Sequence, residues 1–191
     1  MRTGVYGGTF DPIHIGHLIT ALAVKEIRNL DKIIFIPSYI APHKIGKERA
    51  SSQHRIEMIK KSIEGIPFLD YSTYEIDKKG VSFTIDTLNY LKKEYDEIEL
   101  IIGYDNLIDF KTWKDPDEIF KLVKVVTLNR NVAKEPVEKD RFYYAAEIIN
   151  TPTIDISATE IRKRVKENKP INFLVTEAVM EYIYRFNLYK D

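Results

Sequence analysis

The sequence contains no cysteine among its 191 residues. A chain without cysteine can form no disulfide bond, no zinc site with thiolate ligands and no cysteine nucleophile. Its fold must therefore be stabilised by a hydrophobic core, and a chain of this length is long enough to bury one.

Long hydrophobic runs and a net charge are also missing. No apolar run approaches the roughly 20 residues that cross a bilayer, and the opening MRTGVYGGTF lacks the apolar core of a secretory signal. The 29 Lys and Arg residues balance the 29 Asp and Glu residues, which argues against a general binder of polyanions such as DNA. We expect a cytoplasmic protein whose partners include neither a membrane nor a nucleic acid.

What the sequence does contain is an alternation of short apolar runs and segments with helical periodicity. This alternation is typical of an α/β fold in which helices cover both faces of a parallel sheet. We expect a single domain, residues 1–191. Residues 132–150 are charged and irregular in pattern, and no helix or strand is predicted there. Strands are expected at 3–8, 31–38, 97–103, 123–129 and 152–156, an extended segment at 67–76, and helices at 16–29, 51–65, 84–95, 115–123, 157–168 and 175–187.

Four segments that are far apart in the sequence each follow a predicted strand. They read GGTFDPIHIGH, IPSYIAPHK, GYDN and ISATEIRKR. Ligands of parallel sheets bind outside the carboxyl ends of the strands. We therefore expect these four segments to converge on one rim and to form the ligand site.

The first of these segments predicts a phosphate cradle. Gly7 and Gly8 can adopt backbone angles that other residues resist and let a ligand approach the main chain. The helix expected to begin near His14 would offer free N–H groups and a positive dipole end to an anion. His14 and His17 would share one face of this helix and donate to phosphate oxygens, with Gly16 leaving room between them. Two alternatives remain: a zinc site completed elsewhere, or two ordinary histidines.

GGTFDPIHIGH resembles the first signature of the nucleotidyltransferase superfamily, His-x-Gly-His after the first strand, and ISATEIRKR resembles its second, I-S-x-T-x-x-R. FIPSYIAPHK, SFTIDTL and LIIGYDNLIDFKTW are similar to one branch, the bacterial nicotinate-nucleotide adenylyltransferases. The similarity covers nearly the whole chain and is sparse over 129–150. It implies a doubly wound, Rossmann-like fold and the transfer of AMP from ATP to nicotinate mononucleotide, which gives deamido-NAD and pyrophosphate.

The resemblance also implies partners and roles. The partners are ATP and nicotinate mononucleotide, with Mg²⁺ bound through ATP and no metal-binding residue in the protein. In this reaction a phosphate that is already anionic attacks the α-phosphorus, so catalysis depends on positioning and charge neutralisation. The matching residues are His14, His17, Lys44 and Arg162 for catalysis; Gly8, Thr9, Phe10, Gly16, Asp105, Ile156, Ser157 and Thr159 for ATP; and Gly7, Thr84 and Trp113 for the acceptor.

Several residues have a second interpretation. Asp11 is either part of the site or only a turn residue before Pro12. Trp113 either stacks on the pyridine ring of the acceptor or anchors the core. Ser157, in a capping box with Glu160, could cap a surface helix whose basic residues are merely solvated.

The function also has alternatives. The family often carries Arg-Pro-Gly after its fourth strand, where this chain has Asn129-Arg130-Asn131-Val132. This departure leaves open which acceptor the protein prefers. It also leaves open the oligomeric state, and a homo-oligomer is possible. The alternatives are an adenylyltransferase for nicotinamide mononucleotide or phosphopantetheine, a nucleotide-binding regulator without turnover and, more distantly, a fragment of a tRNA synthetase.

Overall fold

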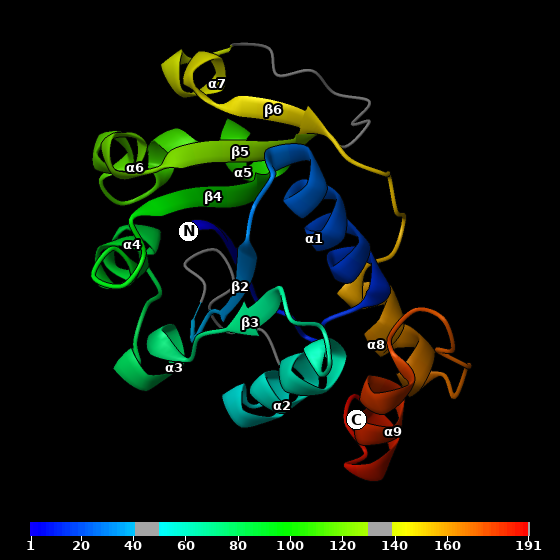
Figure 1. Ribbon diagram of the computed structural model, residues 1–191. Coiled ribbons are helices and arrows are strands. Elements are labelled where there is room, and N and C mark those ends of the chain that lie inside the picture. Colours follow the sequence, from blue (N-terminus) through cyan, green and yellow to red (C-terminus); the bar gives the residue numbers. More distant parts are fainter. Residues whose placement is uncertain (41–49, 130–138, 191) are drawn as a thin grey trace.

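The structure is a computed structural model that describes residues 1–40, 50–129 and 139–190. Within these ranges the chain forms one sheet of six parallel strands in the order β3-β2-β1-β4-β5-β6 (Figure 1). In the centre of the sheet, Val5 pairs with Ile34 on one side and with Leu100 on the other. The strands are β1 (Arg2–Gly8), β2 (Lys32–Pro37), β3 (Leu69–Tyr71), β4 (Glu97–Gly103), β5 (Lys124–Asn129) and β6 (Glu147–Asn150).

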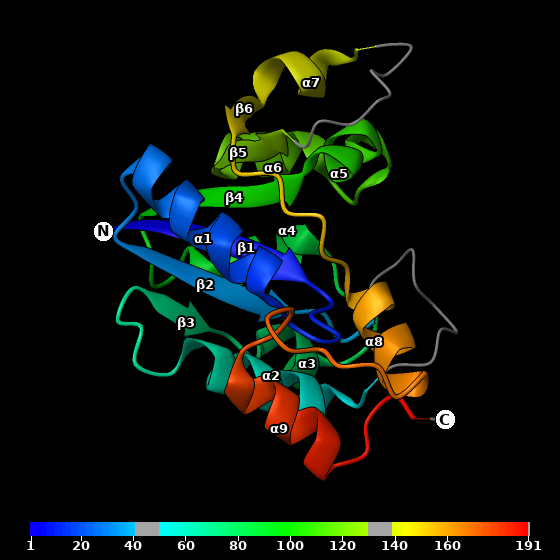
Figure 2. The same cartoon turned by 90° about the vertical axis from the view of Figure 1, so that its right-hand side faces the viewer.

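The side chains of the central strands alternate between two hydrophobic clusters. Phe35 and Ile101 belong to the cluster on one face, whereas Ile34 and Leu100 belong to the cluster on the other. Because both faces are apolar, both need a cover of helices. Helices α1 (Ile15–Arg28), α2 (Ser52–Ile63), α8 (Ala158–Lys166) and α9 (Glu177–Arg185) pack on the first face, and Figure 2 shows α1 in front of the central strands. The second face carries α4 (Thr84–Leu91), α5 (Tyr104–Ile108), the 3-10 helix η2 (Phe110–Thr112), α6 (Pro116–Leu122) and α7 (Arg141–Ala145).

Serine residues cap two of the helices, one of them at the predicted Ser157. The Ser51 hydroxyl accepts a hydrogen bond from the His54 amide at 3.3 Å, and the Ser157 hydroxyl accepts one from the Glu160 amide at 3.1 Å. Pro116 occupies the first position of α6, where its missing N–H costs nothing. None of the helices in the described ranges is long and apolar enough to cross a membrane.

Two predicted elements are wrong. Residues 151–157 have no regular secondary structure, so the expected strand 152–156 does not exist, and the last strand is β6 in a region where none was predicted. Pro152 lacks an amide hydrogen, and the pairing of β6 with β5 already ends at Asn150. The expected extended segment 67–76 contains only β3 and then turns into α3 (Tyr74–Lys78), which begins after the polar Ser72 and Thr73.

A buried cluster of charges joins the sheet to α1. Glu99 of β4 is 4% exposed and accepts hydrogen bonds from Arg28 Nε and Arg2 Nη2, both at 2.8 Å. Arg28 also forms an ion pair with Glu147 of β6. Burial alone would raise the pKa of the Glu99 carboxyl, but the bonds from Arg28 and Arg2 outweigh it and lower this pKa.

The strand order reverses between β1 and β4. From β1 the chain moves outward through β2 to β3, and it then returns to β4 and moves outward in the opposite direction to β6. This is the doubly wound arrangement predicted from the sequence, and it is confirmed. In such sheets the ligand-binding crevice lies at the reversal, outside the carboxyl ends of the strands.

Candidate active site

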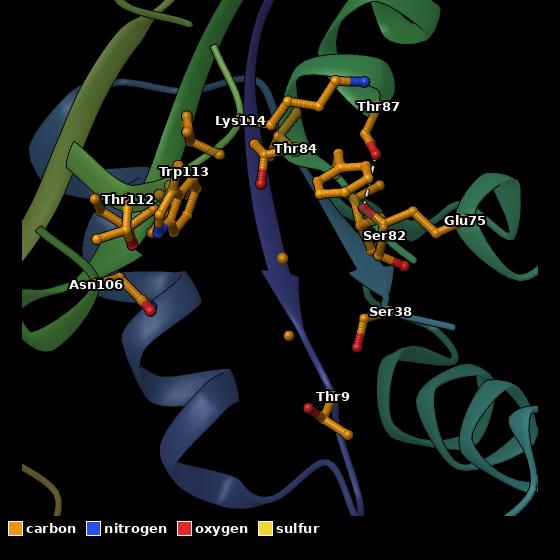
Figure 3. A pocket seen from close by; sticks show the side chains of 18 residues that line it. Thr9, Ser38, Glu75, Ser82, Thr84, Thr87, Asn106, Thr112, Trp113 and Lys114 are labelled. Atoms are coloured by element: carbon orange, nitrogen blue, oxygen red, sulfur yellow. Dashed lines mark hydrogen bonds between the residues drawn. The ribbon is translucent and has the colours of Figure 1, made fainter. Parts of the chain in front are cut away.

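A cavity of about 290 Å³ lies at the point where the strand order reverses. Gly7 and Gly8 at the end of β1 and Ile102 near the end of β4 are among its lining residues. Figure 3 shows the other side chains around β1, with Trp113 and Asn106 on one side of this strand and Ser38, Ser82 and Glu75 on the other. The cavity is therefore the crevice that the topology predicts.

This cavity contains the three residues expected to bind the acceptor. Gly7 lies near the end of β1, Thr84 opens α4, and Trp113 follows η2. The half-buried indole of Trp113 stacks on the buried ring of Phe110, with 4.7 Å between ring centroids and 24° between ring planes. Trp113 thus packs against the core and also lines the cavity, while its stacking on a pyridine ring stays a prediction.

The cavity also contains a carboxylate that the sequence analysis missed. Glu75 of α3 accepts a hydrogen bond from Thr87 Oγ1 at 2.6 Å, and Ser82 lines the same cavity. The Ser82 oxygen itself accepts from the Tyr39 amide at 3.0 Å. Burial raises the pKa of the Glu75 carboxyl, and the two hydroxyl groups oppose this rise. Glu75 went unnoticed because its segment was predicted to be extended.

His14 and His17 lie together at the start of α1. Their rings stack with centroids 3.7 Å apart, which confirms that they share one face. His17 Nδ1 accepts a hydrogen bond from the His14 amide at 3.2 Å, so a neutral His17 carries its proton on Nε2. A donor at Nε2 is what a phosphate oxygen requires.

In the described ranges no three His, Cys, Asp or Glu side chains come together, so the zinc alternative finds no ligand set there.

The loop before these histidines is shaped differently from the prediction. Neither Gly7 nor Gly8 has a positive φ, whereas Phe10 has a φ of 49°. A Cβ atom on Gly8 would lie 2.8 Å from the Phe10 ring, and one on Gly16 would lie 3.1 Å from His14 Nδ1. Gly8 and Gly16 are therefore needed for close packing and not for unusual backbone angles.

The start of α1 offers an anion fewer donors than predicted. An α-helix leaves four amides at its start without an intrahelical partner, which here are those of His14, Ile15, Gly16 and His17. The His14 amide donates to His17 Nδ1 at 3.2 Å, the Ile15 amide to the Leu174 carbonyl at 2.9 Å and the His17 amide to the His14 carbonyl at 2.9 Å. Three of these four amides thus already have acceptors within the protein. Positive charge for a phosphate must come largely from side chains.

Arg162 of α8 supplies such a charge at this loop. Its Nη1 donates to the Asp11 carbonyl at 2.6 Å, and its Nη2 donates to Thr159 Oγ1 at 3.2 Å. The two sequence signatures therefore converge, as expected. Ser157 and Thr159 lie exposed at the start of α8. Arg162, Lys163 and Lys166 line a second cavity of about 600 Å³.

Gly16 and Ile156, both expected to bind ATP, line a third cavity. It measures only about 10 Å³ and lies between α1 and the segment that links β6 to α8. This volume holds about one water molecule. A nucleotide base at this position therefore requires residues 151–156 to move outward.

Two expected residues remain. Lys44 lies outside the described residues, as does the run after Asn129 that departs from the family pattern, so their roles stay predictions. Asp105 is exposed in the first turn of α5, and its neighbour Asn106 lines the first cavity.

Arg55 is a further residue of the site that the sequence analysis missed. It is 2% exposed, and its Nη1 donates to the Thr9 carbonyl at 2.8 Å and to the Ser38 carbonyl at 2.7 Å. It thereby ties the loop after β1 to the end of β2. Helical spacing places Arg55 on the same face as Met58 and Ile59, and a charged residue on an apolar face is the signal that could have found it.

Comparisons with known proteins identify the family of this chain. The cytidylyltransferase-like family model matches residues 5–164. A Plasmodium falciparum nicotinic acid mononucleotide adenylyltransferase complexed with NaAD shares the fold, with a TM-score of 0.77 and 19% identity over 98% of this chain and 97% of that one. Probable nicotinate-nucleotide adenylyltransferases of Caldicellulosiruptor saccharolyticus and Caldicellulosiruptor bescii are 41% and 42% identical, with 100% of each chain covered. The chain belongs to the cytidylyltransferase-like family and, within it, to the nicotinate-nucleotide adenylyltransferases.

Proposed function

We propose that this protein transfers AMP from ATP to nicotinate mononucleotide, releasing pyrophosphate and forming deamido-NAD for NAD biosynthesis. One observation carries the proposal furthest. The first cavity runs from Trp113 and Thr84 to Gly8 and Thr9, which belong to the loop that leads to His14. It can therefore take a mononucleotide with its aromatic ring at one end and its phosphate at the other. The names of the full-length relatives support the same reaction.

The reaction needs charge neutralisation more than it needs a base. An oxygen of the 5′-phosphate of nicotinate mononucleotide attacks the α-phosphorus of ATP. The bond from this phosphorus to the oxygen bridging to the β-phosphate breaks, and pyrophosphate leaves with both electrons of that bond. His17 Nε2 donates to an α-phosphate oxygen while His14 orients its ring. Arg162 binds the leaving phosphates.

The remaining ATP residues complete this arrangement. We propose that Ser157, Thr159 and Lys44 bind the β- and γ-phosphates together with Arg162. Mg²⁺ enters with ATP and, when bound, neutralises charge on the triphosphate. We propose that this ion is held by phosphate oxygens and water.

The acceptor end of the cavity lies at the start of a helix. The first turn of α4 faces the cavity through Phe83, Thr84 and Thr87. The positive dipole end of this helix favours a carboxylate over a neutral amide, whereas the Glu75 carboxylate bonded to Thr87 opposes one. The names of the full-length relatives favour the acid, so we propose that nicotinate is preferred over nicotinamide here, while Trp113 stacks on the pyridine ring.

Pyrophosphate release tests the proposal. Wild-type protein is supplied with ATP and Mg²⁺ and with nicotinate mononucleotide, nicotinamide mononucleotide or phosphopantetheine, and His17→Ala serves as the control. Turnover mainly with the first acceptor supports the proposal. Turnover only with another acceptor overturns the substrate, and ATP binding without any turnover would show a regulator.

A further inference from the structure

The last described segment of the chain returns to the loop that leads to His14. Tyr189 donates its hydroxyl to Asp11 Oδ1 at 2.6 Å, although 178 positions separate them in the sequence. The Ala50 amide, just before α2, donates to the same oxygen at 3.2 Å. Asp11 itself is 3% exposed. Asp11 is therefore more than a turn residue, because its buried carboxylate joins three distant segments.

Asp11 also contacts Arg162, the cation proposed to bind the leaving phosphates. Arg162 Nη1 donates to the Asp11 carbonyl at 2.6 Å and lies 4.0 Å from Asp11 Oδ2. One residue thus contacts Tyr189 through its side chain and Arg162 mainly through its backbone. A change in the position of Asp11 must change the direction of the Arg162 guanidinium.

We propose that Tyr189 is a positioning residue for ATP, which holds Asp11 so that Arg162 is directed at the triphosphate. This inference rests on the proposed function. A guanidinium has five N–H donors in one plane, and two of them go to Asp11 and Thr159. These two bonds fix the plane of the group, and the others can bind phosphate oxygens in the paired geometry that arginine favours.

Two further observations agree with this role. Tyr189 and Arg162 line the same cavity of about 600 Å³, together with Lys163 and Lys166, so the tyrosine lies beside a basic space large enough for phosphates. Burial and the negative charge of Asp11 raise the pKa of the Tyr189 phenol. The hydroxyl therefore stays protonated and remains a donor throughout the neutral pH range.

Two matched variants test the proposal. Tyr189→Phe removes the donor to Asp11. Tyr182→Phe, in α9, removes a hydroxyl that bonds to His54 Nδ1 at 2.9 Å and has no described contact with Asp11. We expect Tyr189→Phe to raise the KM for ATP about tenfold, as the loss of a hydrogen bond to a charged group would. The KM for the acceptor should change by less than about twofold, and Tyr182→Phe should change both constants by less than about twofold.

The role of Arg162 is tested by combining variants. If Tyr189 acts through Arg162, Tyr189→Phe should have no further effect on ATP binding in an Arg162→Lys background. The dissociation constant of ATP, measured by calorimetry without acceptor, gives this result even if the wild-type protein shows no turnover. Failure of the proposed function and failure of this inference are therefore distinguishable. Equal effects of Tyr189→Phe and Tyr182→Phe on ATP binding, or additive effects of Tyr189→Phe and Arg162→Lys, would overturn the inference.

Discussion

Replacement of Arg55 by methionine should destabilise the protein strongly, because this buried arginine joins two strand ends. Methionine is also long and unbranched but donates no hydrogen bond. The change leaves the Thr9 and Ser38 carbonyls without their described donor and also removes a bond to Ser52 Oγ at 3.2 Å. An unpaired buried polar group costs about 1–3 kcal/mol. Relief from burying a cation offsets part of this cost, so we expect a net loss of about 2–4 kcal/mol of unfolding free energy.

Thermal unfolding followed by circular dichroism measures this loss. For chains of about this size each kcal/mol lowers Tm by about 2–4 °C, so Arg55→Met should unfold about 5–15 °C below the wild type. Arg185→Met is the matched control, since Arg185 is exposed at the end of α9, and its effect should stay within about 0.5 kcal/mol. A loss for Arg55→Met no larger than that of the control would refute the reasoning that the two carbonyls depend on Arg55.

Three further predictions concern the site and the charge cluster. Trp113→Ala should raise the KM for nicotinate mononucleotide about tenfold or more through lost stacking and leave the KM for ATP unchanged; equal changes in both constants in steady-state assays would argue against an acceptor role. His17→Ala should lower kcat about 100-fold or more with little change in Tm, and a kcat near the wild-type value would exclude its contact with the reacting phosphate. Glu99→Gln should cost about 3 kcal/mol at neutral pH. Because the pKa of Glu99 is lowered in the folded state, its stabilising effect is present above the ordinary pKa of glutamate and is lost as the pH falls through the lowered value. Urea unfolding over a pH series should therefore show the gap between wild type and Glu99→Gln closing in acid, and a constant gap would contradict the ion-pair explanation.

The central sheet could be predicted because its signal is local. Runs such as KIIFIP and LIIG contain consecutive apolar residues, a pattern typical of a short strand that is covered on both faces. The position of the loop after β1 could be predicted for a related reason. Its glycines and histidines are uncommon residue types gathered in one short stretch, and Gly7 and Gly8 line the cavity at the point where the strand order reverses. Its role toward phosphate stays a prediction.

The elements that were missed depend on contacts between distant residues. Strand β6 is only four residues long, and its pairing with β5 makes it a strand. The PTIDI segment nearby forms none, because Pro152 interrupts the backbone donors after Asn150. Nothing near Tyr189 in the sequence indicates that its partner would be Asp11, since that bond exists only after α8 and α9 have packed on the first face of the sheet.

The way α1 begins explains why distant side chains matter for the proposed phosphate site. A helix terminus with free amides could bind an anion with little help from the rest of the chain. Here the amides of His14, Ile15 and His17 already donate to acceptors within the protein. The positive groups must therefore come from side chains, and Arg162 arrives from α8 through contacts that also involve Tyr189. ATP affinity should consequently depend on the packing of α8 and α9 against the sheet, and substitutions far from the first cavity should weaken ATP binding before they weaken acceptor binding.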